Sequence, residues 1–134
     1  MILKIQELIE NYNYPNEGFI VDIDIEGYIK KLLEKAVILT FYENNLSAFI
    51  AFYANDTKSN IGFLSMLIVD SELQGKGLGY MLYKQSEDYL KQRGFTIYQL
   101  EVNRKNSNVL NFYIGLGFYV ISIKSNFIKM QKDL

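Results

Sequence analysis

The centre of the chain contains one long apolar segment, residues 61–69, that runs through a short turn into a glycine-rich loop and a helical pattern. A nearly continuous apolar run of this length indicates a strand that is buried on both faces, in the middle of a sheet. The helical pattern extends from about Leu78 to Arg93 and stops at Gly94, and a second strand-like segment, Phe95–Val102, follows. Strand, helix and strand in this order predict one right-handed parallel crossover at the centre of the fold.

The residues before this unit predict two helices and a β-hairpin. Apolar side chains recur at helical spacing in the first helix, at Ile2, Ile5, Ile9 and Tyr12. A polar loop, Asn11–Gly18, follows, and a second helix begins after Asp22 or Asp24. Residues 37–42 and 46–54 are rich in aromatic and branched side chains and flank a polar turn, which predicts two hairpin strands.

The residues after the unit predict a short helix and a second hairpin. The helix covers Ser107–Leu116 and stops at Gly117, and the hairpin joins Phe118–Lys124 to Phe127–Gln131. The full order is helix, helix, three strands, helix, strand, helix and two strands. This order predicts a mixed α/β fold, and 134 residues are enough for a single domain covering residues 1–134.

The residue types that are absent exclude several kinds of chemistry. The chain has no cysteine, which excludes disulfides, thiolate nucleophiles and zinc held by cysteine. It has no histidine either, which excludes imidazole bases and the common hydrolase triads, and we expect no metal. Acid–base chemistry must therefore come from Asp, Glu, Tyr, Lys or water.

Charge and hydropathy predict where the protein works and what it does not bind. The net charge is −1, which argues against nucleic acids and anionic membranes as partners, because both require a basic surface. No apolar run approaches the roughly 18 residues that a membrane-spanning helix needs. The first ten residues carry two acidic side chains and no small-residue cleavage site, so they do not resemble a signal peptide. We therefore expect a cytoplasmic protein.

The glycine-rich loop before the long helix predicts an anion site. The first amides of a helix lack partners within the helix, and glycines let a phosphate approach the backbone closely. A Rossmann loop does not fit, because Tyr80 stands at the third glycine, and a Walker A loop does not fit, because Gly77 follows Lys76. The pattern that remains is Q-x-x-G-x-G, with Gln74, Gly77 and Gly79. An ordinary strand-to-helix turn is the alternative explanation for the glycines.

This pattern resembles the pyrophosphate loop of the GNAT superfamily of acetyl-CoA-dependent N-acetyltransferases. A second block of that family, N-x-x-A-x-x-[LF]-Y-x-x-x-G-F, follows one strand later. Its residues here are Asn106, Val109, Phe112, Tyr113, Gly117 and Phe118, with valine in place of alanine. Two blocks in the expected order make the resemblance much more specific than either block alone.

The resemblance implies a mostly antiparallel sheet, flanked by about four helices, with a parallel strand pair at its centre that splays apart. Acetyl-CoA, the acyl donor, is expected to insert its pantetheine arm into the splay and to place its pyrophosphate on the loop amides. A splayed pair leaves unpaired backbone groups that suit such a ligand. The residues implied in donor binding are Leu67, Ile68, Val69, Gln74, Gly75, Lys76, Gly77, Leu78, Gly79 and Asn106.

The resemblance also implies direct transfer of the acetyl group to an amine within a ternary complex. Tyr113 is implied as the acid that protonates the leaving thiolate. For the base, Glu101, Asp70 and a bound water remain as candidates, with Glu101 placed first. Each residue has a simpler explanation as well, since Tyr113 can be a packing residue, Asn106 a helix cap and Glu101 a solvated side chain.

The acceptor is the least constrained part of the prediction. We expect a primary amine of a small molecule, with a protein N-terminus or lysine as one alternative and a CoA-binding module without activity as another. The aromatic candidates for lining its site are Tyr12, Tyr14, Tyr28 and Tyr53. The family usually opens with a strand before its first helix; residues 1–5 are the alternative for such a strand here, but their apolar spacing fits a helix better. The apolar residues of the last hairpin predict a sheet edge that can support a homodimer, and these are Phe127, Ile128 and Met130.

Overall fold

The computed structural model describes residues 2–13 and 25–134, and the expected start of the second helix, Pro15 and Tyr14 lie outside these ranges. The elements follow one another as α1 (Ile2–Asn13), α2 (Ile25–Lys35), β1 (Val37–Glu43), β2 (Asn45–Asp56), β3 (Ile61–Val69), the short 3-10 helix η1 (Ser71–Leu73), α3 (Leu78–Gln92), β4 (Ile97–Asn103), α4 (Ser107–Gly115), β5 (Tyr119–Lys124) and β6 (Phe127–Asp133). The first described element is therefore a helix, as the spacing of its apolar residues predicts.

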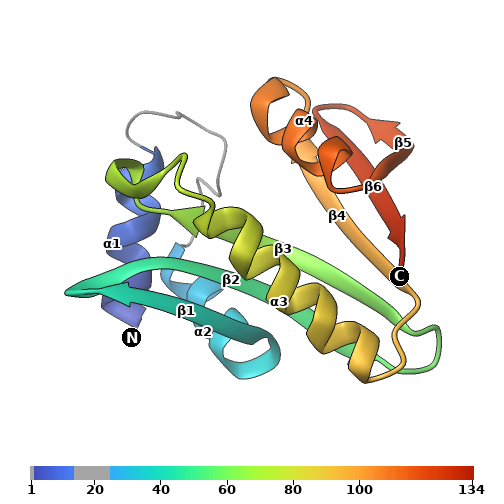
Figure 1. Cartoon of the computed structure of the whole chain (residues 1–134), viewed down its shortest axis with the longest axis horizontal. Helices are drawn as coiled ribbons and strands as arrows, with labels where there is room; N and C mark the ends of the chain where they lie inside the picture. Colours follow the sequence, from blue (N-terminus) through green and yellow to red (C-terminus); the bar gives the residue numbers. More distant parts are fainter. Residues whose placement is uncertain (1, 14–24) are drawn as a thin grey trace.

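Six strands form one sheet in the order β1-β2-β3-β4-β6-β5. The central pair, β3 and β4, is parallel, and the other described neighbours pair in antiparallel orientation. Helix α3 makes the connection between the two parallel strands (Figure 1). These observations confirm the mixed α/β fold with a central parallel pair and four α-helices in the described residues.

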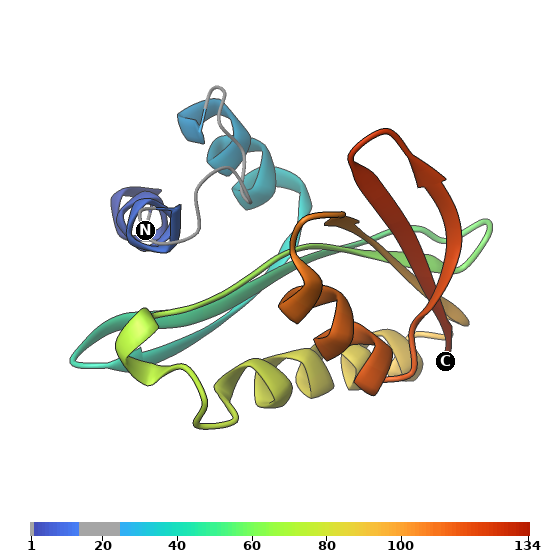
Figure 2. The same ribbon diagram turned by 90° about the horizontal axis from the view of Figure 1, so that it is seen from above.

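The helices cover the two faces of the sheet separately (Figure 2). On one face, α1 and α2 pack buried leucine and isoleucine side chains against Phe49, Met66 and Ile68 of β2 and β3. On the other face, α3 and α4 cover a larger aromatic core. In it, Tyr83 of α3 lies with Tyr98 of β4 and with buried residues of β2, β3 and β6. Burial on both faces explains why residues 61–69 form an apolar run without a clean alternation.

Both predicted glycine stops end their helices in the same way. After α3, Gly94 has a φ of +82°, its amide donates to the Lys91 carbonyl at 3.1 Å, and the Phe95 amide donates to the Leu90 carbonyl at 3.0 Å. This is a Schellman cap, which requires a left-handed residue and therefore favours glycine. The cap uses Phe95, so β4 begins at Ile97, two residues later than the sequence predicts.

The first hairpin turns more tightly than expected. Strand β1 extends to Glu43 and β2 begins at Asn45, so Asn44 alone forms the turn, with a φ of +67°. Asparagine tolerates this left-handed conformation better than most residues. Strand β2 also continues to Asp56, two residues beyond the end that the sequence predicts at residue 54.

The prediction of a dimer edge at Phe127, Ile128 and Met130 is wrong. These residues belong to β6, which lies between β4 and β5, and Ile128 and Met130 are buried. The outermost strand on this side of the sheet is β5. The sequence does not distinguish the two strands of a hairpin by which of them returns to the sheet, because that depends on the long-range pairing of β4 with β6.

A buried carboxylate ties the C-terminal strand to α3. Glu87 is 2% exposed, and its oxygens lie 3.2 Å from Lys132 Nζ of β6 and 3.1 Å from Lys91 Nζ. Lys132 also donates to the hydroxyl of Tyr83 at 3.3 Å. Burial alone raises the pKa of Glu87, but hydrogen bonds from Lys91 and Lys132 outweigh it and lower that pKa below the ordinary value.

We expect this cluster to make folding stability depend on pH. Because the folded-state pKa of Glu87 is lowered, its contribution is complete above the ordinary pKa that the group has in the unfolded chain and is lost as pH falls through the lower folded-state pKa. At pH 7, Glu87→Ala leaves Lys132 partly buried without its main partner and is expected to cost about 3 kcal/mol. Urea titrations from pH 7 to pH 3 measure this difference. Glu34→Ala, at an exposed position of α2, is the control, and an equal loss in both variants would contradict the assignment.

Candidate functional site

The central parallel pair separates after three rungs. Strands β3 and β4 pair at Ile61 with Ile97, at Gly62 with Tyr98 and at Phe63 with Gln99, and no further pair follows in these fully described strands. Beyond this point β3 pairs with β2 alone, up to Val69, and β4 pairs with β6 alone, up to Asn103. The divergence of the two strands is visible in Figure 1. The facing backbone groups of the two strands therefore lack a strand partner, which confirms the predicted splay.

A bulge in β3 marks the point where the strands diverge. On the β2 side, Ala51 pairs with Met66 and Phe52 with Leu64, so Ser65 has no partner in that ladder. A β-bulge increases the local twist and bends its strand. Since the last rung with β4 is at Phe63, the bulge bends β3 just where the opening begins. Nothing in the sequence around Ser65 predicts this bulge.

Ser65 connects the bulge to α2. Its hydroxyl lies 2.5 Å from the hydroxyl of Tyr28, so the two share a hydrogen bond. Burial, and then the nearby Tyr28, raise the pKa of Tyr53 on β2. Of the four tyrosines predicted near the acceptor, Tyr28 and Tyr53 therefore lie close together beside the opening, while the side chain of Tyr12 and all of Tyr14 lie outside the described residues.

The loop after β3 is held by its own side chains. The Asp70 carboxylate accepts a hydrogen bond from the Glu72 amide at 3.0 Å and caps η1, and the Asp70 amide donates to the Ser47 carbonyl at 2.8 Å. The side-chain amide of Gln74 donates to the Val69 carbonyl at 3.1 Å. The glutamine of the loop motif thus connects the loop to the end of β3.

The start of α3 presents backbone donors to solvent. Gly75 and Gly77 have φ values of +81° and +82°, and a Cβ at either position would meet no atom within 4 Å. Gly77 is the N-cap and provides no side-chain hydrogen bond, while its carbonyl accepts from the Met81 amide at 3.0 Å. The first-turn amides, from Leu78 to Tyr80, therefore receive no cap from the side chain of the N-cap residue. Such a helix start is a suitable anion site, and exposed Lys76 adds a positive charge beside it.

Three segments of the predicted donor site meet at Gly79. A Cβ there would lie 3.8 Å from Phe112 Cζ of α4, 3.8 Å from Val69 Cγ2 and 4.0 Å from Leu67 Cδ2 of β3. The end of β3, the first turn of α3 and the middle of α4 are therefore close together. This arrangement brings the predicted residues of β3, the loop and the second motif to one place.

The second motif is explained by how α4 begins and ends. Asn106 is its N-cap and accepts a hydrogen bond from the Val109 amide at 3.3 Å. At the other end, the Phe118 amide donates to the Tyr113 carbonyl at 3.0 Å across Gly117, in a second Schellman cap. The rings of Tyr113 and Phe118 are edge to face, with centroids 5.6 Å apart. Gly117 and Phe118 thus hold the buried Tyr113 in position. Asn106 caps the start of the helix, which is the simpler explanation for this residue.

Glu101 lies on the other face of the sheet from Tyr113. In β4, Tyr98, Leu100 and Val102 point into the core beneath α3 and α4, where Tyr113 also lies. Glu101 is exposed and alternates with these residues, so its side chain points to the face that carries α1 and α2. It lies beyond the last β3–β4 rung and faces Lys129 of β6. The structure therefore places both catalytic candidates on the elements that border the splay, on opposite faces of the sheet.

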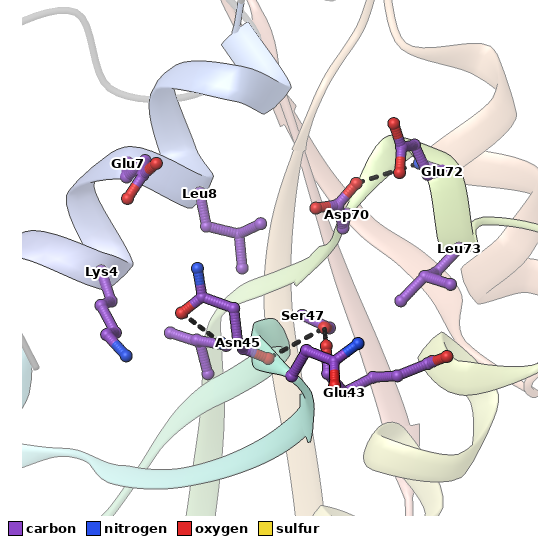
Figure 3. Close-up of a pocket in the computed structure, with 11 residues that line it drawn as sticks. Lys4, Glu7, Leu8, Glu43, Asn45, Ser47, Asp70, Glu72 and Leu73 are labelled. Carbon is purple, nitrogen blue, oxygen red and sulfur yellow. Dashed lines mark hydrogen bonds between the residues drawn. The ribbon is translucent and has the colours of Figure 1, made fainter.

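Asp70, the other candidate base, lines a different feature. A cavity of about 290 Å³ lies between α1, the β1–β2 turn and η1 (Figure 3). Its charged lining residues are Lys4, Glu7, Glu43, Asp70 and Glu72. None of the described lining residues belongs to β4, α3 or α4, so this cavity is not the opening between β3 and β4.

Two kinds of feature are absent from residues 2–13 and 25–134. No helix in these ranges is long and apolar enough to cross a membrane. No three acidic side chains in the same ranges come close enough together to hold a metal ion.

A mixed sheet that opens between two parallel strands, beside an uncapped helix start, is the architecture of acyl-CoA-dependent acetyltransferases. A family model described as the acetyltransferase (GNAT) family matches residues 2–118. The chain belongs to this family.

Solved structures share this fold over almost the whole chain. The PaiA N-acetyltransferase of Thermoplasma acidophilum, solved with coenzyme A, superposes with a TM-score of 0.82 at 24% identity and covers 99% of this chain and 92% of that one. The ribosomal-protein-S18-alanine N-acetyltransferase of Escherichia coli has a TM-score of 0.74 at 21% identity and covers 87% of this chain and 79% of that one. These likenesses concern the fold.

Two curated proteins match part of the chain. An uncharacterized N-acetyltransferase of Methanocaldococcus jannaschii is 29% identical over 81 residues, which are 60% of this chain and 36% of that protein. The ribosomal protein bS18-alanine N-acetyltransferase of Salmonella typhimurium is 36% identical over 61 residues, 46% of this chain and 41% of that protein. The matched segments thus span less than half the length of either relative.

Proposed function

We propose that this protein transfers the acetyl group of acetyl-CoA to a primary amine of a small molecule. The observation that carries the proposal is the early end of the β3–β4 ladder, after the pair of Phe63 and Gln99. The strands continue for several residues beyond it and leave backbone donors and acceptors facing an opening. An extended ligand with amide groups satisfies such an opening in the way that a missing strand would.

The described residues fit acetyl-CoA as the ligand of this opening. The backbone of Leu67, Ile68 and Val69 would pair with the amide-containing arm, and Asn106 would lie beside it. The amides from Gly75 to Gly79 would hold the pyrophosphate, because they combine an uncapped helix start with open space above two left-handed glycines. Phosphate and a helix N-terminus attract each other electrostatically.

The opposite placement of Tyr113 and Glu101 supports separate roles in the transfer. Acetyl-CoA supplies a thioester, whose carbonyl carbon is open to attack by a neutral amine. Glu101, on the face of α1 and α2, would accept the proton that the amine loses, since alkyl amines are mostly protonated at pH 7. Tyr113, on the opposite face, would donate a proton to the departing thiolate. Backbone amides in the splay would stabilise the charge that develops on the carbonyl oxygen.

A second candidate acceptor is the α-amino group of a protein. The Salmonella relative acts, by its name, on an alanine of ribosomal protein bS18, and it is 36% identical over the matched residues. A cytoplasmic location and the absence of nucleic-acid and membrane partners remain predictions from the sequence.

The proposal is tested by following thiol release from acetyl-CoA with spermidine, tyramine, glucosamine and an alanine-initiated hexapeptide. We expect release with at least one of the three small amines, and release with the peptide alone would favour the second candidate. A thermal-shift titration with acetyl-CoA, NADH and ATP tests the donor site separately. Saturation at about 100 times the dissociation constant adds roughly 2.7 kcal/mol of stability. The absence of both a shift with acetyl-CoA and any thiol release would overturn the proposal.

The assignment of the base predicts different results for two acidic residues. Glu101→Gln keeps the shape of the side chain but removes its basicity, so we expect kcat/KM to fall by about 10²–10⁴-fold. Asp70→Asn is the matched control, since Asp70 lines the separate cavity and caps η1. Steady-state rates against pH measure the loss, and an equal or larger loss in Asp70→Asn would reassign the base.

A further inference from the structure

The outermost strand β5 exposes an unusual amount of apolar surface. Tyr119 and Val120 are 44% exposed, Ile121 is 41% exposed and Ile123 is 55% exposed. The described residues include ten exposed large apolar side chains, and four of them lie in this one strand of six residues. Exposed apolar side chains that gather on one strand mark an interaction site more often than solitary exposed residues do.

The same strand also has an open backbone edge. Strand β5 pairs with β6 on one side and is the last strand of the described sheet on the other. Unpaired strand edges tend to take up another strand. The opposite edge strand, β1, differs, because Val37–Phe41 are partly buried and both α2 and α3 contact this strand.

A bulge sorts the side chains of β5 onto two faces. Val120 pairs with Met130 and Ser122 with Lys129, which leaves Ile121 without a partner on β6. Val120 and Ile123, opposite the buried Met130 and Ile128, therefore share the face that carries α3 and α4. The remaining residues with partners point to the other face, and these are Tyr119, Ser122 and Lys124.

We propose that β5 pairs in antiparallel orientation with β5 of a second copy, about a twofold axis between Ile121 and Ser122. In this register Val120 faces Ile123 of the partner subunit, and Tyr119 faces Lys124 of the partner subunit. Each of these pairs joins side chains that point to the same face, as an antiparallel ladder requires. A shift by one residue in either direction places Val120 opposite Ser122 or Lys124 instead, so the bulge selects this register.

The register is favourable in both apolar contact and charge. It buries Val120 and Ile123 of both copies in one row and places each Lys124 beside a tyrosine ring, which attracts cations. It also keeps the two Lys124 side chains from facing each other. One strand edge is smaller than the roughly 1,200–2,000 Å² of a standard interface, so we expect a dimer with a dissociation constant in the micromolar range.

The dimer leaves the proposed donor site open. Strand β5 is separated from β4 by β6, and the splay lies on the far side of β4. The inference therefore does not depend on the proposed function, and the two can fail separately.

Sedimentation velocity of the full chain from about 1 to 200 μM tests the dimer, which has twice the 15.6 kDa mass of the monomer. We expect the wild type to shift from monomer to dimer across this range and Ile123→Lys to remain monomeric. Leu3→Lys, at a 79% exposed position of α1, is the control and should dimerise like the wild type. A monomeric wild type at every concentration, or a fully dimeric Ile123→Lys, would overturn the proposal.

The register is tested by a charge pair. Val120→Glu and Ile123→Lys are each expected to abolish dimerisation. The double variant Val120→Glu/Ile123→Lys places opposite charges against each other at both ends of the axis and should restore the dimer, with an affinity that falls as salt is added. A double variant that stays monomeric would contradict this register. Thermal shifts with acetyl-CoA, measured in each variant, keep the dimer separate from donor binding.

Discussion

Gly77→Glu is expected to abolish acetyl-CoA binding, with a loss of affinity of at least 100-fold. Gly77 is the N-cap of α3, and open space lies above its Cα. A glutamate there places a carboxylate beside the uncapped amides that the pyrophosphate would use, so it competes for the same donors and repels the phosphates. Isothermal titration with acetyl-CoA measures the effect.

The chain offers a close control for this substitution at Gly94. Gly94 has the same φ of +82° and also has no atom within 4 Å of an added Cβ, but it lies at the opposite end of α3. Both variants therefore carry a similar backbone strain of about 1–2 kcal/mol from a left-handed residue. We expect Gly94→Glu to bind acetyl-CoA like the wild type. If the two variants lose affinity equally, strain rather than the anion site explains the loss.

Tyr113→Phe is expected to lower kcat by about 10²–10³-fold while the affinity for acetyl-CoA changes little. The ring is buried and held by Phe118, so phenylalanine keeps the packing and removes the hydroxyl alone. A catalytic acid acts on the leaving thiolate, and its loss therefore appears in turnover rather than in donor binding. Single-turnover rates with the best acceptor of the amine panel, together with acetyl-CoA titration, separate the two quantities.

Tyr83→Phe is the matched control for Tyr113→Phe. Tyr83 is 1% exposed, and its ring meets the same Phe118 at a centroid distance of 5.8 Å. Burial, and then the charge of Glu87, raise the pKa of Tyr83 far above that of an ordinary tyrosine, so its hydroxyl serves as a hydrogen-bond partner of Lys132. We expect its loss to reduce stability and leave kcat nearly unchanged. Wild-type turnover in Tyr113→Phe would remove Tyr113 as the acid.

Local sequence signals predicted most of the elements, because those signals act over a few residues. The apolar run of β3, the glycine stops of α3 and α4, and the Asn106 cap all concern hydrogen bonds or burial within one element or its ends. The strand-helix-strand order around α3 then predicts the parallel pair, since a crossover helix joins parallel strands. The two motifs identify the family because each is a short segment: the first is one loop and the start of a helix, and the second is one helix with the residues at its two ends.

One difference between the predicted and the observed elements is local, and the other two arise where one element depends on distant ones. The start of β4 was placed too early because the Schellman cap after α3 takes up Phe95. The dimer edge was placed on β6 because the apolar pattern of β6 does not show that β4 occupies its other side. The Ser65 bulge was missed because it is defined by the register of β2 against β3.

The sequence by itself determined the elements, the glycine-rich helix start and the family, because each of these follows from local backbone preferences or from short motifs. The tertiary structure alone decided that the β3–β4 ladder ends at Phe63, that Glu101 and Tyr113 face opposite sides of the sheet, and that Glu87 meets Lys132. These features depend on strand register and on contacts between residues far apart in the chain. Register is a property of the assembled sheet, in which a shift of one residue turns every side chain to the other face.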